Sequence, residues 1–589
     1  MTTAPVDRRR TPGPVSPAPH VLREYALVAD GERGALIGPR GEVAWLCVPR
    51  WDSPSVFSSL IGGRGCYTIT PDARFVWGGY YEEGSLIWHS RWVTEGGILE
   101  CREALAYPAE PERAVLLRQV HAVDTDAALD VSLMPRADYD RVPMTELHRR
   151  RGVWTARVGD LYLRWTGGAQ ARVRAGERLD LRLELSAGQE HELCLELSPR
   201  PLPDQLPDVT ALWHRSTIAW QDAVPAMDSG LAPRDTRHHY AVLRGLTSRS
   251  GGMVAAATTG LPERSDAGRN YDYRYVWIRD LSFAGVAVAA QGESEFLDDA
   301  VRFVTARLLQ DGDRLAPAYT TSGERVPPPR QLGVPGYPGA HGVAGNRIDE
   351  QFQLDCFGEA LELLAAAAAQ DRLDNDGRRA VEVAADAIVG RWTEPDSGIW
   401  ELDPQPWTHS RLAAVAGLRA ASTAASDSAV RADWLALADK ILADTAAHAL
   451  HHSGRWQRSP TDEGLDAALL LPGLRGAVEA GDPRTAETLR AYLRELTVDG
   501  YAYRFRQDDR PLAQAEGSFL LCGFLVALSL QRLDDRVEAR AWYERTRAAC
   551  GPPQLFSEEF DTDQHQLRGN LPQAFVHALA IEASARLSC

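Results

Sequence analysis

The sequence lacks the features that mark membrane and secreted proteins. No run of about eighteen apolar residues occurs anywhere in the chain, so we expect no membrane-spanning helix. Residues 1–20 contain three consecutive arginines and several prolines but no apolar stretch. That composition predicts a disordered tail rather than a signal peptide, and the expected location is the cytoplasm.

Paired cysteines and excess positive charge are also missing. The eight cysteines occur singly, with no CxxC pair, so neither a metal site nor a redox motif is indicated and we expect free thiols. The 64 Lys and Arg residues are outnumbered by 81 Asp and Glu residues, which gives a formal net charge of −17. Phosphate-rich surfaces require a basic face, so neither nucleic acid nor a membrane is an expected partner. No cofactor is expected. The sequence is compatible with a homo-oligomer and does not predict one.

The chain does contain enough residues, 589, for more than one hydrophobic core. Over residues 21–200, short runs alternate between polar and apolar side chains, most strictly at residues 179–185, and turns rich in Gly, Pro and Asp separate them. This pattern predicts an N-terminal antiparallel β-sandwich. Five prolines then mark a linker with a short helix over residues 201–235.

Residues 236–589 show helical periodicity and predict a second domain. Apolar residues at positions i, i+3, i+4 and i+7 predict twelve helices. They are expected near residues 235–247, 280–290, 294–309, 351–369, 376–391, 408–422, 427–452, 464–474, 483–496, 516–531, 534–549 and 572–587. Long and short connections alternate, so all the long loops are expected at one end of an antiparallel series. The six long connections are 248–279, 310–350, 392–407, 453–463, 497–515 and 550–571. We therefore expect a multidomain α and β protein, in which the sandwich precedes an (α/α)6 barrel, a six-hairpin toroid.

The first long loop ends in an aromatic and charged stretch, residues 268–280. Arg279 offers a fork of donors and Asp280 an acceptor, which is the combination needed to hold adjacent sugar hydroxyls. The alternative is a buried pair that caps the next helix.

A second loop, residues 392–401, contains a Pro and a Gly that prevent a continuous helix. It holds Glu401 beside Trp400. A carboxyl packed on an indole loses hydration, which raises its pKa toward the range that a general acid needs near neutral pH. The alternative is a surface packing pair.

Glu516 ends another long loop and is predicted to open an apolar helix. The helix macrodipole would favour its ionised form, which a general base requires, although an ordinary first-turn glutamate is the alternative. On one face of the domain, Glu401 and Glu516 would form a pair of carboxyls. Inverting glycosidases place such a pair roughly 6.5–9.5 Å apart, so that a water fits between the base and the sugar.

Five motifs in this order resemble glycoside hydrolase family 15, the glucoamylase, glucodextranase and trehalase family, and the resemblance spans residues 25–583. They are ALIGPRG at 35–41 with WLCVPRWDSP at 45–54, RNYDYRYVWIRD at 269–280, GIWE at 398–401 with THSR at 408–411, EGSFLLC at 516–522 and GNLPQAFVH at 569–577. The family implies a β-sandwich followed by an (α/α)6 catalytic barrel and inversion at a non-reducing α-glucosyl residue.

Carried over motif by motif, the resemblance implies that Glu401 is the acid and Glu516 the base, while Arg279 and Asp280 hold the glucose. The other residues of the implied sugar pocket are Tyr273, near the catalytic water, and Trp277, Trp400, Trp407 and His409. The chain departs from the common pattern at Leu402 and Asp403 after the acid, and at Arg411 in place of a lysine. These departures affect the expectation for the substrate rather than for the carboxyls.

The resemblance thus implies an inverting, exo-acting α-glucoside hydrolase that releases β-glucose from small α-glucosides such as trehalose, isomaltose or malto-oligosaccharides. Two other classes are open. An inverting disaccharide phosphorylase uses phosphate in place of the activated water and needs no carboxylate base. A non-catalytic sugar-binding protein is expected to have lost one of the two glutamates, and both are present.

Overall fold

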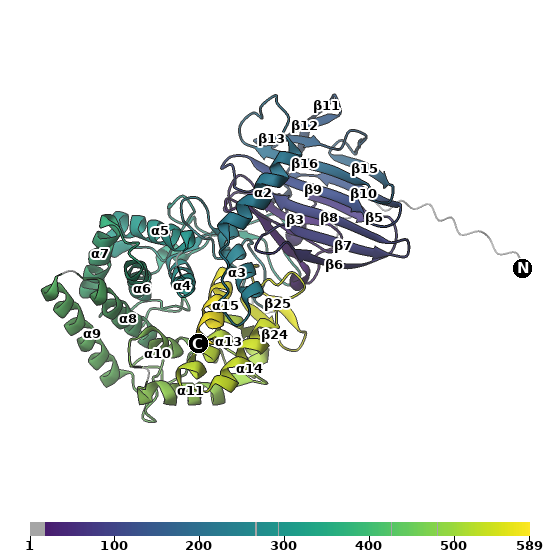
Figure 1. The fold of residues 1–589 in the computed structure, drawn as a ribbon. Helices are drawn as coiled ribbons and strands as arrows, with labels where there is room; N and C mark the ends of the chain where they lie inside the picture. Colours follow the sequence, from purple (N-terminus) through teal and green to yellow (C-terminus); the bar gives the residue numbers. More distant parts are fainter. Residues whose placement is uncertain (1–17, 265–267, 293, 426, 480, 589) are drawn as a thin grey trace, which may run out of the picture.

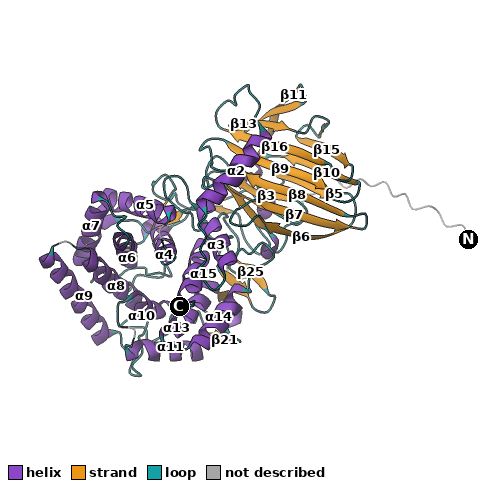
Figure 2. Ribbon diagram, viewed as in Figure 1, coloured by secondary structure: helices purple, strands orange, loops and turns teal. Residues whose placement is uncertain are grey.

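A sheet-rich N-terminal region lies beside a ring of helices in the computed structural model of the chain, which describes residues 18–264, 268–292, 294–425, 427–479 and 481–588 (Figure 1). The predicted tail over residues 1–20 falls almost entirely outside these ranges. Strands and long helices are separated almost completely between the two regions (Figure 2).

Two eight-stranded sheets, antiparallel throughout, form the N-terminal region, as the alternating pattern predicted. One sheet has the order β1-β2-β3-β5-β10-β15-β14, with β4 paired to β3: β1 Ala26–Ala29, β2 Gly34–Ile37, β3 Glu42–Cys47, β4 Ser55–Phe57, β5 Cys66–Pro71, β10 Ala127–Met134, β14 Arg172–Arg174 and β15 Arg178–Leu185. The other has the order β11-β12-β13-β16-β9-β8-β7-β6: β6 Phe75–Tyr81, β7 Trp88–Thr94, β8 Ile98–Leu105, β9 Ala114–Ala122, β11 Val142–Arg150, β12 Val153–Val158, β13 Leu161–Thr166 and β16 Glu190–Ser198.

The two sheets share one hydrophobic core, to which both contribute large side chains such as Tyr67 and Trp165. Within β15, the leucines at every second position are buried, and the polar residues between them are partly or fully exposed. Burying one face of each strand against the opposite sheet fixes the register, because a slip of one residue would expose the apolar face.

Helix α2 (Val209–Ala223) connects the two regions and packs on the second sheet (Figure 1). Tyr107 stacks on Trp220 at 4.3 Å between ring centroids, and the guanidinium of Arg102 lies 4.4 Å from the ring of Trp213. The side chain of Asp208 caps the helix by accepting from the backbone N–H of Ala211.

The helical region is built from inner and outer helices (Figure 1). Within the described residues, six helices contact one another in a closed ring: α4 Ile278–Ala289, α6 Asp355–Ala369, α8 Thr408–Ala424, α10 Leu471–Arg475, α13 Leu520–Arg532 and α15 Ala574–Arg586. Outside them lie α3 Pro233–Leu246, α5 Glu295–Asp311, α7 Asn375–Arg391, α9 Ser428–His448, α11 Pro483–Glu495 and α14 Arg536–Arg547. The inner helices are apolar nearly all round, as in α13, where every residue from Leu520 to Leu530 is buried.

The predicted helices agree with these bounds to within two residues except at four places, one of which is the end of α9, at His448 rather than near residue 452. Helix α6 starts at Asp355 rather than near residue 351, and the helix predicted at 464–474 is a 3-10 turn, Ala467–Leu470, followed by the short α10. Helix α13 starts at Leu520, so the prediction that Glu516 opens a helix is wrong. Glu516 has an extended backbone, and Ser518–Phe519 (β23) pair instead with β24 (Glu559–Asp561), a partner that local periodicity cannot reveal.

In addition to 3-10 turns at Leu22–Glu24, Ser59–Ile61, Gly312–Arg314 and Ile348–Glu350, shorter elements complete the described chain. They are α1 Ala137–Asp140, α12 Leu512–Ala515, β17 Val276–Trp277 with β18 Ala318–Tyr319, β19 Arg330–Gln331 with β20 Val343–Ala344, β21 Thr497–Val498 with β22 Tyr501–Ala502, and β25 Gln566–Arg568 beside β24. The seven cysteines in this part of the chain are free thiols, as predicted. None of its helices has both the length and the apolar character needed to cross a bilayer.

Candidate active site

A cavity of about 740 Å³ lies where the long loops of the helical region converge. Among the described residues, five of the six predicted long connections contribute to its wall: 248–279, 310–350, 392–407, 497–515 and 550–571. The connection 453–463 does not line it. The cavity has the size of a small-molecule site.

Arg279 and Asp280 lie on this wall, in the first turn of α4. The Arg279 guanidinium donates to the carbonyl of Ile399 at 3.0 Å and lies 3.3 Å from Asp280. Burial raises the pKa of Asp280 to about 6, against the lowering effect of Arg279. The N-cap position of α4 is Trp277, so Asp280 does not serve as the cap, and the pair faces the cavity instead.

Glu401 reaches the same cavity from a loop, and its own backbone is left-handed there, with φ +57°. Its Oε1 accepts from the indole N–H of Trp277 at 2.8 Å and from Arg279 at 3.3 Å. The neighbouring Trp400 lines the cavity and donates its own N–H to Asp466 at 2.5 Å. The indole in hydrogen-bond contact with the carboxyl of Glu401 is therefore that of Trp277, two loops away.

Glu516 is buried, with 1% of its surface exposed, and is not among the described residues that line the cavity. Its Oε2 accepts from Arg504 Nη2 at 2.9 Å and Nε at 3.2 Å, and from the amide of Gln507 at 3.0 Å. Arg504 and Gln507 themselves line the cavity. The structure thus places Glu516 behind two cavity residues and in contact with both.

Glu558 is a cavity carboxyl that the sequence analysis missed. Tyr273, which packs edge-on against Trp277, donates its hydroxyl to Glu558 Oε2 at 3.0 Å. Burial, reinforced by the nearby carboxyl of Glu263, raises the pKa of Glu558 to about 8. The signal in the sequence was the adjacent pair of glutamates at 558 and 559, in the last long loop.

The GNLPQAFVH motif supports the segment that carries Glu558. The imidazole of His577 accepts the backbone N–H of Phe556 at 3.2 Å, and the N–H of Gln573 donates to the carbonyl of Phe556 at 2.8 Å. The amide of Asn570 donates to the carbonyl of Tyr271 at 2.8 Å, which joins the same motif to the first long loop of the helical region. The motif therefore fixes two walls of the cavity.

Trp407 and His409 lie outside the cavity. They line a small space behind the loop of Trp400, together with Arg458 and Asp466. Burial, with Arg279 nearby, lowers the pKa of His409 to about 3, so the ring is neutral at ordinary pH. Trp407 lies against the loop that presents Glu401, since a Cβ added to Gly398 would lie 2.9 Å from its ring, and His409 lies 3.8 Å from Asp355.

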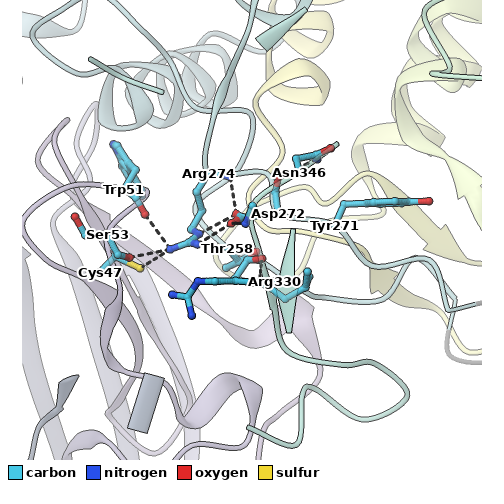
Figure 3. Close-up of polar contacts among 12 residues, drawn as sticks. Cys47, Trp51, Ser53, Thr258, Tyr271, Asp272, Arg274, Arg330 and Asn346 are labelled. Carbon is cyan, nitrogen blue, oxygen red and sulfur yellow. Dashed lines mark hydrogen bonds and ion pairs between the residues drawn. The ribbon is translucent and has the colours of Figure 1, made fainter. Parts of the chain in front are cut away.

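Arg274 joins the N-terminal region to the loop that carries Tyr273 (Figure 3). Its guanidinium donates to the carbonyls of Ser53 at 2.9 Å and Trp51 at 3.3 Å, and to Asp272 at 2.7 Å. The aromatic segment at residues 45–54 thus lies between the two regions and anchors a cavity loop. A buried, paired guanidinium at this junction leaves little freedom for that loop.

Comparison with known families matches residues 237–585 to the model of glycosyl hydrolases family 15, and residues 12–188 to the model "Trehalase-like, N-terminal". The chain belongs to glycosyl hydrolases family 15. It is a glycosidase.

Relatives of this family 15 chain match it over nearly its whole length. A trehalase of Mycolicibacterium smegmatis is 31% identical, with 99% of this chain and 93% of the relative covered, and a trehalase of Mycobacterium tuberculosis is 30% identical, with 95% and 89% covered. A bacterial glucoamylase solved with acarbose superposes with a TM-score of 0.72 at 13% identity, covering 98% of this chain and 96% of that one. At that identity the likeness concerns the fold.

Proposed function

We propose that this glycosidase hydrolyses small α-glucosides with inversion, trehalose first among them, and releases β-glucose from the non-reducing end. The observation that carries the proposal is that two carboxyls, Glu401 and Glu558, reach one cavity whose wall contains Arg279 and Asp280. Trehalose leads the substrates because the two relatives at 30% identity or above are named trehalases. Isomaltose and malto-oligosaccharides follow.

In this proposal Glu401 is the general acid. It protonates the glycosidic oxygen as the bond breaks, and its contacts with Trp277 and Arg279 fix the direction of its carboxyl. Arg279 and Asp280 hold hydroxyls of the glucose. An arginine and a carboxyl supply donors and acceptors that match adjacent hydroxyls, and the charge makes each hydrogen bond stronger.

Glu558 is the general base of the proposal. It removes a proton from a water that attacks the anomeric carbon from the face opposite the leaving group, which inverts the configuration. The hydroxyl of Tyr273, at 3.0 Å, orients the carboxyl. Glu516, the base predicted from sequence, is the competing candidate, but its Oε2 already accepts from Arg504 and Gln507.

We also infer that the helical region is an (α/α)6 barrel and the two sheets a sandwich, with the catalytic domain over residues 236–589. The closed ring of inner helices, the outer helices beside it and the gathering of long loops at one end support this inference.

Glucose release from trehalose, isomaltose and maltose, measured with and without inorganic phosphate, tests the function. Hydrolysis predicts free glucose from trehalose at an initial rate that phosphate does not alter. Glucose 1-phosphate formed in proportion to added phosphate would show a phosphorylase instead. Binding without turnover of any of the three sugars would show a sugar-binding protein.

A further inference from the structure

Glu263 is a second carboxyl beside Glu558, and no motif or proposed catalytic step has given it a role. It lines the cavity, is 5% exposed, and its backbone N–H donates to the carbonyl of Arg269 at 3.1 Å. A Cβ added to Gly569 would lie 3.5 Å from Cβ of Glu558 and 3.9 Å from Cγ of Glu263. The two side chains, both of which line the cavity, therefore flank the same point of the chain, Gly569.

Glycine is required at that point. Gly569 has φ +83°, in the left-handed region, and its N–H donates to the carbonyl of Pro262 at 2.8 Å. The hydrogen bond joins the segment after Glu558 to the segment before Glu263. The backbone thus holds the two carboxyls close together even though about 300 residues of chain separate them.

Positive charge in this part of the cavity comes mainly from Arg504. Its Nη2 lies 2.9 Å from Glu516, 3.7 Å from Glu263 and 3.9 Å from Glu559. The titratable or charged groups that face Glu263 or Glu558 are Arg269, Arg504, Tyr271, Tyr273, Asp280, Glu401, Glu516 and Glu559. Carboxyls outnumber guanidiniums in this set, so repulsion opposes full ionisation.

We propose that Glu263 is a positioning residue that shares one proton with Glu558 in the empty cavity and so sets the pH above which Glu558 can act as a base. The inference rests on the proposed function, in which Glu558 activates water. Two neighbouring buried carboxyls lose their protons in two separate steps, because the first negative charge opposes the second. Burial and, after it, the charge of Glu263 raise the pKa of Glu558, in agreement with this arrangement.

The sign of the effect follows from the form that reacts. The base is active when deprotonated, so kcat/KM rises as pH rises through the pKa of Glu558 in the free enzyme. In Glu263→Gln the neighbouring charge is gone, and Glu558 ionises at lower pH. We expect the acid limb of the kcat/KM profile for trehalose to move down by about one pH unit.

Two matched variants separate this role from a structural one. Glu559→Gln removes a buried carboxyl that also faces Arg504 but does not line the cavity. The pKa of Glu558 is raised by burial, Glu263 and Asp280, so the acid limb of Glu559→Gln should stay near that of the wild type. Glu263→Asp keeps the charge and should keep the limb. The proposal is overturned if the acid limb of the kcat/KM profile does not move in Glu263→Gln, or if it moves equally in Glu559→Gln.

A second readout does not depend on turnover. Carbon-13 NMR of protein labelled at glutamate carboxyls follows the titration of Glu558, assigned by its absence in Glu558→Gln. Its midpoint should fall in Glu263→Gln by the same amount as the activity limb, and an unchanged midpoint overturns the inference. Failure of the proposed function is separate, since it appears as wild-type protein that releases no glucose from any α-glucoside.

Discussion

Glu516 and Glu558 are both buried and both belong to long loops of the helical region. Both also interact electrostatically with Arg504. They differ in what their carboxyls face. Glu558 meets Tyr273 on the cavity wall, whereas Glu516 is held by Arg504 and Gln507 and does not line the cavity. The difference teaches that a family motif and a position before a helix leave the choice between two glutamates open. Access to the cavity has to be known as well.

The largest expected effect separates the two glutamates directly. Glu558→Gln should lower kcat for trehalose by about 10² to 10⁴-fold, the usual contribution of a general base, with the fold intact. Glu516→Gln should lower it by about tenfold or less. Steady-state rates of both variants, with circular dichroism as the control for folding, make the comparison. The reverse ranking would restore Glu516 as the base.

Glu401 provides the second test, because the loss of activity on replacing it should depend on the leaving group of the substrate. Glu401→Gln should reduce turnover of trehalose by several orders of magnitude and that of α-glucosyl fluoride much less, since fluoride departs without a proton. The ratio of kcat/KM for the two substrates is the measurement. Equal losses on both substrates would remove Glu401 from the role of acid.

Stability should rank the glutamates in the opposite order to activity. In Glu516→Gln the charge that faces Arg504 is lost, while Glu263 and Glu559 remain near the guanidinium. We expect unfolding free energy to fall by about 2 kcal/mol, within the range for hydrogen bonds to charged groups. Chemical denaturation of both Gln variants measures this. A larger loss for Glu558→Gln would contradict the view that Glu516 holds the wall and Glu558 faces the substrate.

Asp280→Asn should give the smallest effect on turnover and a clear effect on selectivity. A site built around particular hydroxyls leaves its own polar groups unpaired when one hydroxyl is inverted. We expect a preference for α-glucosides over α-galactosides that weakens in the variant, while the melting temperature changes little. Matched nitrophenyl glycosides give the ratio of kcat/KM. Full selectivity in a strongly destabilised variant would mark the Arg279–Asp280 pair as structural.

Much of the fold could be predicted because its signals are local. The alternation at residues 179–185 predicted β15, and helical periodicity predicted the helices of the second region to within a few residues at most ends. The errors arise from contacts between distant segments. Pairing of β23 with β24 keeps Glu516 out of a helix, and no local pattern contains it.

The site was predictable in part for the same reason. Arg279, Asp280, Tyr273, Trp277, Trp400 and Glu401 line the cavity because they follow one another in two loops that form its wall. Trp407 and His409 lie close to Glu401 in sequence, but the start of α8 turns them behind the loop. Glu558 and Glu263 come together through the segment at Gly569, which sequence spacing does not show.

Azide rescue tests the central claim most directly. Removing a general base as Glu→Ala leaves space where a small anion can enter and attack the anomeric carbon without needing a base. We predict that azide restores turnover of an activated α-glucoside by Glu558→Ala and yields β-glucosyl azide, whose anomeric configuration proton NMR reports. Glu516→Ala should gain nothing from azide. Rescue of Glu516→Ala and not of Glu558→Ala would contradict the account.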